Sequence, residues 1–315
     1  MFFSKEETTW SSATWSSAAC RLIVNAASHP IEYAKVLIQI GHEPIAPYPS
    51  RTLFGRPALA LPNVYKYIKY IKSVDGFTGC YRGLVPKLCS STVSTMVYEK
   101  TAEYIRFKQG TRQVYSEEED ERAEKYIQDF IRALISTTVG IIVSHPLDVI
   151  AIRMMAQFVG GETKYIGLMQ SLIEIYKENG IAGYFSGLMP RLIAGAAILT
   201  IVSSSTYVIN KYIITDREMK GFTSSTMMFL AATVAYPFIV VSNCMAVNDC
   251  GLVAGMPPQM PIYGNWLDCW SHLSATNQLK RGSSLLWRYY TGPITVLNGK
   301  PFPISTANLY MKSVH

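Results

Sequence analysis

The 315-residue chain is 49% hydrophobic and only 16% charged, whereas ordinary soluble domains carry about 25% charged residues, so its composition favours a membrane protein. Its 29 Lys and Arg residues outnumber its 22 Asp and Glu residues, giving a net charge of +7. Because the basic residues are dispersed among loops, we expect them to face anionic lipid rather than nucleic acid. The six cysteines show no CxxC spacing, and we find no phosphate-loop, nucleophile or metal motif, so we expect no metal, no cofactor and no enzyme activity.

Five membrane-spanning helices are predicted, near residues 14–40, 84–106, 126–158, 188–214 and 223–249. The last two give the strongest signal, because residues 192–210 and 222–248 hold no charged residue and are long enough to cross a hydrocarbon core of about 30 Å. The first two are too polar for hydropathy alone to identify, and their prediction depends on an internal repeat. Amphipathic surface helices are expected near residues 63–74, 165–179 and 262–274.

Three connecting segments are expected outside the helices. Residues 41–62 hold five prolines and therefore cannot form a helix. Residues 116–125 read SEEEDERAEK, which is typical of a solvated acidic linker. The glycines and prolines of residues 251–264 end the fifth span.

Two short elements recur in the same order, about a hundred residues apart. The first is His29–Glu32 (HPIE), which is echoed by His145–Asp148 (HPLD) and more faintly by Tyr236–Ile239 (YPFI). The second is GCYRGLVPKL, ending at Leu88, which recurs as GYFSGLMPRL, ending at Leu192. The chain therefore divides into repeats 1–110, 111–215 and 216–315, the last of them degenerate. We expect the proline of each first element to kink its helix; these are Pro30, Pro146 and Pro237.

The first span carries a polar stripe along one face. Its members recur at intervals of 4, 3, 4, 3 and 4 residues, a helical spacing: Arg21, Asn25, Ser28, Glu32, Lys35 and Gln39. A charge at the bilayer centre costs about 2.5–3.5 kcal/mol on insertion scales, so such residues usually line water or mark function. Hydrogen bonding between spans is the alternative, at about 0.6 kcal/mol per contact. It fits less well for Arg21, Glu32 and Lys35, which are three ionisable residues on one face.

These elements resemble the repeat of the mitochondrial carrier superfamily, where a Pro-x-acid-x-x-basic motif lies on each odd-numbered span. The resemblance implies three helix pairs around a central axis, and we expect an all-α membrane protein with this carrier-like, three-repeat helical bundle. A transporting carrier closes its cavity with a ring of ion pairs from all three motifs. Here Ala151 replaces the second base, and Ile239 and Ser242 replace both charges of the third motif. At most one contact of that ring can remain, so we expect the gate to be lost.

The sixth span of a carrier is expected to be missing. Only 28 residues follow Trp287, and glycine, prolines and charges interrupt them, so a 20-residue apolar helix does not fit. Without that helix we expect the bundle to stay open, leaving a lateral hydrophilic groove that faces lipid. The residues expected to line the groove are Arg21, Asn25, Glu32, Lys35, Gln39, Asp148, Tyr236 and Asn243.

Four segments narrow the resemblance to the mitochondrial carrier homolog subfamily: KVLIQIGHEPI, GRPALALPNV, YPFIVVSNCMAVNDCGL and MPPQMPIYGNWLDCW. That subfamily implies a multi-pass protein of the outer mitochondrial membrane that inserts tail-anchored and other α-helical proteins. It also implies phospholipid scrambling and docking of truncated BID in apoptosis. Lys35, Tyr236 and Asn243 match groove positions of the subfamily. Residues 193–196 lack the acid expected in the fourth span, which lowers the insertase strength that we expect.

Three functional hypotheses follow. The first is an outer-membrane insertase that gives the polar tail of a client a hydrophilic path past the lipid. The second is a solute carrier of the inner membrane, which the missing helix and charges disfavour. The third is a docking scaffold without transport, for which neutralising the groove would change nothing.

Overall fold

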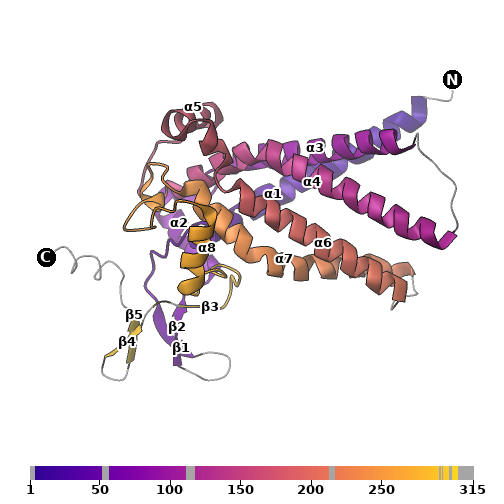
Figure 1. The fold of residues 1–315 in the computed structure, drawn as a ribbon. Helices are drawn as coiled ribbons and strands as arrows, with labels where there is room; N and C mark the ends of the chain where they lie inside the picture. Colours follow the sequence, from indigo (N-terminus) through magenta and orange to yellow (C-terminus); the bar gives the residue numbers. More distant parts are fainter. Residues whose placement is uncertain are drawn as a thin grey trace.

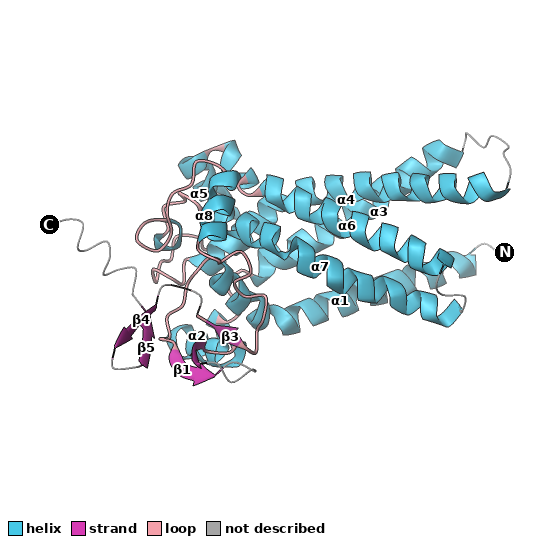
Figure 2. Cartoon of the chain, turned by 60° about the horizontal axis from the view of Figure 1, so that its bottom comes forward, coloured by secondary structure: helices cyan, strands magenta, loops and turns pink. Residues whose placement is uncertain are grey.

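The computed structural model describes residues 4–51, 57–110, 118–212, 217–290, 292, 294–297 and 300–303. The fold is dominated by five long helices that run alongside one another (Figures 1 and 2). These are α1 (Ser4–Gln39), α3 (Leu84–Gly110), α4 (Glu118–Ala156), α6 (Leu188–Tyr212) and α7 (Arg217–Val247). Helix α3 packs along α4, and α6 packs along α7. The five predicted spans are thus confirmed as helices.

Three helical stretches are long and apolar enough to cross a membrane on composition alone: Glu124–Ala156, Ile181–Asn210 and Phe222–Val247. Helices α1 and α3 do not reach that standard, because their polar residues lower the mean hydropathy. Pro30, Pro146 and Pro237 each lie inside a long helix, α1, α4 and α7 respectively.

Short helices gather at one end of the bundle, as Figure 2 shows. They are α2 (Val64–Gly79), α5 (Leu168–Asn179), the 3-10 turns η1 (Ile181–Phe185) and η2 (Val253–Gly255), and α8 (Trp266–Ala275). The Asn63 side chain caps α2, and Asn265 forms a capping box with Asp268 at the start of α8. The predicted surface helices are therefore confirmed. We call this the closed end of the bundle.

The proline-rich loop is free of helix, as predicted, but it forms strands that the sequence analysis did not predict. Strands β1 (Tyr48–Arg51), β2 (Pro57–Leu61) and β3 (Arg288–Tyr289) make an antiparallel sheet in which Tyr48 lies opposite Ala60, and Ala60 opposite Tyr289. A separate hairpin joins β4 (Ile294–Leu297) to β5 (Lys300–Pro303). Strand β3 ties the third repeat to the first.

The prediction of a solvated loop at 116–125 is wrong for most of that segment. Helix α4 begins at Glu118, so the acidic run forms the first turns of the helix, where glutamates suit the helix dipole. Residues 116 and 117 lie outside the described part of the chain.

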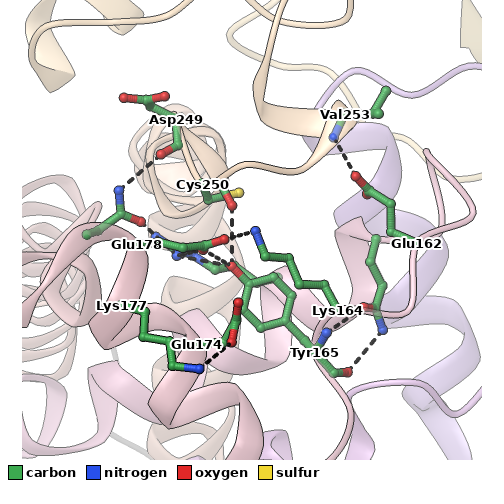
Figure 3. Close-up of polar contacts among 12 residues, drawn as sticks. Glu162, Lys164, Tyr165, Glu174, Lys177, Glu178, Asp249, Cys250 and Val253 are labelled. Carbon is green, nitrogen blue, oxygen red and sulfur yellow. Dashed lines mark hydrogen bonds and ion pairs between the residues drawn. The ribbon is translucent and has the colours of Figure 1, made fainter.

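Most of the buried core lies at the closed end, where the last turns of α1, α4 and α7 meet the short helices. Arg153 of α4 is fully buried there; its Nε donates to the Ala246 carbonyl at 2.9 Å and its guanidinium to the Asn179 side chain at 3.0 Å. Figure 3 shows the surrounding network, in which the Tyr165 hydroxyl donates to Glu178 at 2.5 Å and Lys164 pairs with the same carboxylate. These contacts fix α5 and the segment after α7 onto α4.

Candidate functional site

A histidine anchors each of the first two repeats at the closed end. His29 Nε2 donates to the Arg82 carbonyl at 3.0 Å, and His145 Nε2 donates to the Ser186 carbonyl at 3.0 Å. Each accepting residue stands directly before a glycine in the left-handed region, Gly83 at φ +81° or Gly187. Helices α3 and α6 begin at the next residue. The two repeated sequence elements therefore meet in one recurring contact.

The third repeat keeps this contact with a different residue. Tyr236 stands where the other repeats have histidine, and its hydroxyl donates to the Arg281 carbonyl at 3.0 Å. Arg281 precedes Gly282, whose φ is +77°. The sequence analysis missed this element, although its Arg-Gly pair repeats Arg82-Gly83. After Gly282 the chain does not start a helix but continues to β3.

Close packing at these glycines joins each repeat to the next. A Cβ on Gly83 would lie 2.8 Å from the Ala151 carbonyl oxygen of α4, and a Cβ on Gly187 would clash with the backbone of Ser242 in α7. At Gly282 a Cβ would lie 3.1 Å from Ile38 of α1. The third repeat thus contacts the first, and the three repeats form a ring here. The expectation that the bundle cannot close without a sixth helix is wrong at the closed end, because the Arg281–Gly282 turn takes that place.

Four charged residues form a chain of ion pairs across the first two repeats. Lys87 Nζ of α3 lies 2.9 Å from Glu32 of α1 and 3.4 Å from Asp148 of α4. Arg191 of α6 lies 3.9 Å from the other oxygen of Asp148. Lys87 and Arg191 each stand four residues after the repeat glycine, on the even-numbered helices.

The sequence analysis looked for the bases of the ion-pair ring only in the motifs of the odd-numbered helices. It therefore missed Lys87 and Arg191 as the ion-pair partners of Glu32 and Asp148. Lys35 is the one base that the three carrier motifs retain, and it makes no ion pair with a described residue. Its ammonium lies 5.1 Å from the centre of the Tyr236 ring. In the third repeat, Leu286 stands at the position of Lys87 and Ile239 at the position of Glu32. The ion-pair chain consequently stops before the junction of the third and first repeats.

Hydrogen bonds replace ion pairs at that junction. Gln39 Nε2 donates to the Tyr236 hydroxyl at 2.9 Å, and Asn243 Nδ2 donates to Gln39 Oε1 at 2.6 Å. The Arg281 side chain donates to the Gln39 carbonyl and, at 3.0 Å, to Cys244 Sγ. We call these five residues the seam cluster. Gln39, Tyr236 and Asn243 are each less than 9% exposed, so the cluster is a buried junction between α1 and α7.

A second basic residue, Arg288, also stabilises the junction of the third and first repeats. Arg288 of β3 forms an ion pair with Glu43 and donates to the Pro62 carbonyl at 2.9 Å. Burial raises the pKa of Glu43, and the nearby Arg288 guanidinium opposes that rise. The Tyr290 amide also donates to the Leu59 carbonyl at 2.8 Å. The segment after α8 is thereby held against the first repeat.

A polar cavity of about 150 Å³ lies between the ion-pair chain and the seam cluster. It is lined by five of the eight predicted groove residues: Glu32, Lys35, Gln39, Asp148 and Asn243. Tyr236 joins them through Gln39 and Lys35. Arg21 lies elsewhere and lines a larger cavity of about 320 Å³ farther along the bundle. Asn25 lines neither cavity; its carbonyl accepts a hydrogen bond from the Ser28 hydroxyl.

The part of α1 farther from the closed end is much more exposed than its last turns. Residues 20–24 of α1 are exposed, including Ile23 at 69% and Val24 at 58%, whereas residues 33–40 are largely buried. Among the described residues after Ala275, the chain forms turns and short strands and no further helix. The described residues also contain no group of three His, Cys, Asp or Glu side chains that could hold a metal ion.

Comparison with known proteins places this geometry in context. A family model described as mitochondrial carrier protein matches residues 6–110 and 122–217, which are the first two repeats. The chain is 40% identical to mitochondrial carrier homolog 2 of Mus musculus over 270 residues, covering 83% of this chain and 89% of the relative. It is 36% identical to mitochondrial carrier homolog 1 of Mus musculus over 289 residues, covering 84% and 74%. A more distant relative, mitochondrial thiamine pyrophosphate carrier 1 of Neurospora crassa, is 27% identical over 60% of this chain and 56% of its own length.

Proposed function

Since the chain belongs to the mitochondrial carrier family, and within it to the mitochondrial carrier homologs, we propose that it is an insertase for tail-anchored and other α-helical proteins. Its family and its candidate membrane-spanning helices indicate a mitochondrial membrane protein. We propose that it lies in the outer membrane. The observation that supports the proposal best is the polar face of α1. This face extends from Arg21 to the closed end of the bundle, where the three repeats form a ring.

Such a face lowers the main barrier to insertion. The short tail beyond a client's transmembrane segment is polar, and moving its unpaired polar groups through hydrocarbon is costly. Half-buried Asn25 and exposed Ser28 offer hydrogen-bonding groups on the polar face of α1. A client tail can follow this face while its apolar segment passes sideways into lipid. The apolar segment gains its favourable environment directly, so the process requires no nucleotide hydrolysis.

The seam cluster is the proposed exit for the tail. Neutral hydrogen bonds contribute a net of about 0.5–1.5 kcal/mol each, whereas hydrogen bonds to charged groups contribute about 1.5–3 kcal/mol. The side chains of Gln39, Tyr236 and Asn243 bond to one another as neutral groups, with Arg281 as the one charged member of the seam cluster, whereas the junction of the first and second repeats carries the Lys87–Asp148 ion pair. The seam cluster thus contains no ion pair and lies next to the exposed part of α1, so we propose that the ring opens there.

Two further activities belong to the proposal. A hydrophilic path that faces lipid also suits phospholipid headgroups, so we include phospholipid scrambling. Docking of truncated BID is included from the resemblance to the subfamily, and we assign it to no residue of this chain. As before, we expect no catalytic chemistry from the protein.

An inner-membrane solute carrier is the second candidate, and the Glu32–Lys87–Asp148 ion pairs favour it, since such pairs can close a carrier cavity. They span one junction between repeats, whereas the seam cluster at the junction of the third and first repeats contains no carboxylate, and the Glu43–Arg288 pair near it does not line the 150 Å³ cavity. Saturable exchange of a metabolite by vesicles containing the protein would establish this alternative. A pure docking scaffold is the third reading, and it requires that changes on the α1 face leave insertion unaltered.

Site-specific photo-crosslinking tests the path. A photoreactive amino acid at Ser28, on the polar face of α1, should crosslink to the tail of a client trapped during insertion. The same residue at Ile23, which is also exposed, serves as the matched control and should label lipid instead. Equal labelling of the client from both positions would contradict a path along the polar face.

A further inference from the structure

We propose that the cavity at Arg21 binds the headgroup of a zwitterionic phospholipid, with the phosphate on Arg21 and the ammonium group on Glu99 and Tyr98. This inference rests on the proposed function, because it names the lipid class that would enter the path. The cavity lies between α1, α3 and α4 and has a volume of about 320 Å³. That volume is at the lower end of the range for small-molecule pockets, about 300–1,000 Å³.

The lining of the cavity combines one charge of each sign. Arg21 comes from α1 and Glu99 from α3, and neither forms an ion pair with a described residue. A guanidinium in a membrane protein without a carboxylate partner is a suitable donor to a phosphate, since its fork of N–H groups matches phosphate oxygens. A carboxylate in the same cavity attracts the ammonium group that a zwitterionic headgroup carries next to its phosphate.

Neutral residues complete the recognition surface. The Tyr98 ring is 39% exposed, and an aromatic face attracts quaternary ammonium groups. The hydroxyls of Ser94 and Thr137 line the cavity and make no hydrogen bond with another described residue. Gly140 allows α4 to approach α3 here, because even a Cβ at this position would lie 3.2 Å from the Ser94 carbonyl.

The depth of the cavity matches the level of headgroups. Arg21 stands 18 residues before Gln39 on one continuous helix, a distance of about 27 Å at 1.5 Å per residue. The hydrocarbon core is about 30 Å thick. With the seam cluster at one interface, Arg21 therefore lies near the other. Helix α3 becomes strongly charged just after Glu99, with Lys100, Glu103 and Arg106, as expected for a helix that leaves the hydrocarbon.

The charged residues along α1 and α3 suggest how the bound headgroup would proceed. From Arg21 to Glu32 is about 17 Å along α1, and from Glu99 to Lys87 about 18 Å along α3. The ion-pair chain and the 150 Å³ cavity thus lie about one leaflet away from the Arg21 cavity. A zwitterionic headgroup at Arg21 occupies the first of two polar positions on one continuous path.

Photolabelling of the full-length protein in vesicles tests this site. The probes are phosphatidylcholine and phosphatidylglycerol, each carrying a photoreactive group on the acyl chain next to the headgroup; only the first has an ammonium group. We expect Glu99→Gln to lower labelling of residues 94–99 and 137–141 by the phosphatidylcholine probe about two- to fivefold, the range for one exposed charge contact. Labelling by the phosphatidylglycerol probe should stay the same. Arg21→Gln should reduce labelling by both probes, and Arg21→Lys should restore part of it.

Glu103→Gln is the matched control, because Glu103 lies one turn beyond Glu99 and pairs with Lys100 outside the cavity. It should alter labelling by neither probe. Equal effects of Glu99→Gln on both probes, or labelling of this segment that does not depend on Arg21, would overturn the proposal. Scrambling measured on the same vesicles separates the two claims: selective labelling without scrambling supports the headgroup site and removes the proposed lipid movement. Scrambling without selective labelling supports lipid movement and removes the proposed headgroup site.

Discussion

The Tyr236 hydroxyl donates a 3.0 Å hydrogen bond to the carbonyl of Arg281, which reproduces in the third repeat the contacts of His29 with Arg82 and of His145 with Ser186. The third repeat has lost both charges of its motif, and no described helix follows its surface helix. It still retains this contact, which holds the Arg281–Gly282 turn where it packs against α1 at the closed end. Tyrosine can do this because its hydroxyl, unlike a single imidazole nitrogen, donates and accepts at once. It thereby also receives the Gln39 amide.

Removing that hydroxyl should destabilise the seam. Tyr236→Phe leaves the Gln39 amide and the Arg281 carbonyl without this partner, and an unsatisfied buried polar group costs about 1–3 kcal/mol. We expect a lower thermal unfolding midpoint for the purified protein in detergent. Tyr65→Phe removes a hydroxyl from a 63% exposed side chain of α2 and should leave the midpoint unchanged. Equal midpoints for both variants would show that the hydroxyl of Tyr236 does not stabilise the ring.

The close approach at Gly282 gives a second prediction. Gly282→Ala places a Cβ 3.1 Å from Ile38 and from the Tyr236 hydroxyl, in addition to the left-handed backbone penalty of about 1–2 kcal/mol. Gly161→Ala carries the same kind of backbone penalty at φ +63°, but its Cβ would meet no atom within 4 Å. Gly282→Ala should therefore lower the unfolding midpoint more than Gly161→Ala. If Gly161→Ala is the more damaging change, packing at Gly282 does not hold the repeats together.

The ion-pair chain should act as a coupled unit. Lys87→Gln removes the partner of two acids and should destabilise the protein by about 1.5–3 kcal/mol, the range for hydrogen bonds to charged groups. Lys100→Gln is the control, because its pair with Glu103 is highly exposed on both sides and should contribute little. The double variant Lys87→Gln/Asp148→Asn should lose less than the sum of its single variants. Strict additivity in unfolding measurements would indicate that the two side chains do not interact.

Lys35 should set the charge preference of the path. The 150 Å³ cavity is lined by three basic residues and two acids, if its single histidine is neutral, for a net charge of +1. Lys35→Glu changes that to −1, so insertion of clients with acidic tails should fall while insertion of clients with basic tails should rise. Lys35→Gln should reduce the discrimination without reversing it. Insertion assays with paired clients that differ only in tail charge measure this directly, and identical profiles for all three proteins would count against a charged path.

Much of this architecture is predictable from sequence, because it follows from local patterns. Residues 222–248 hold no charge, so the fifth span is evident, and the repeated His-Pro and Gly-Leu-x-Pro elements locate the more polar helices. The repeated element GLVPKL/GLMPRL places a base at both Lys87 and Arg191, but both were missed as ion-pair partners because sequence alone does not show that bases on even-numbered helices pair with acids on odd-numbered ones. That assignment depends on how the helices cross.

The closing contacts of the ring were missed for a different reason. Strand β3 has two residues, too few to show the alternation that marks a strand, and its partner in β2 lies more than 200 residues earlier. The third repeat element survives as little more than Arg281–Gly282, a pair too short to stand out. Long-range contacts that involve so few residues become visible only in three dimensions.

Insertion into liposomes tests the central claim most directly. Purified protein would be reconstituted, a tail-anchored client added, and its protected transmembrane fragment measured after proteolysis, with empty liposomes as the baseline. The wild-type protein should insert the client well above that baseline. Asn25→Leu/Ser28→Leu removes polar groups from the α1 path and should bring insertion close to the baseline, while Ile23→Leu on the same helix should not. If wild-type protein matches empty liposomes, or if Asn25→Leu/Ser28→Leu inserts as well as wild type with equal folded protein, insertion along the α1 face is contradicted.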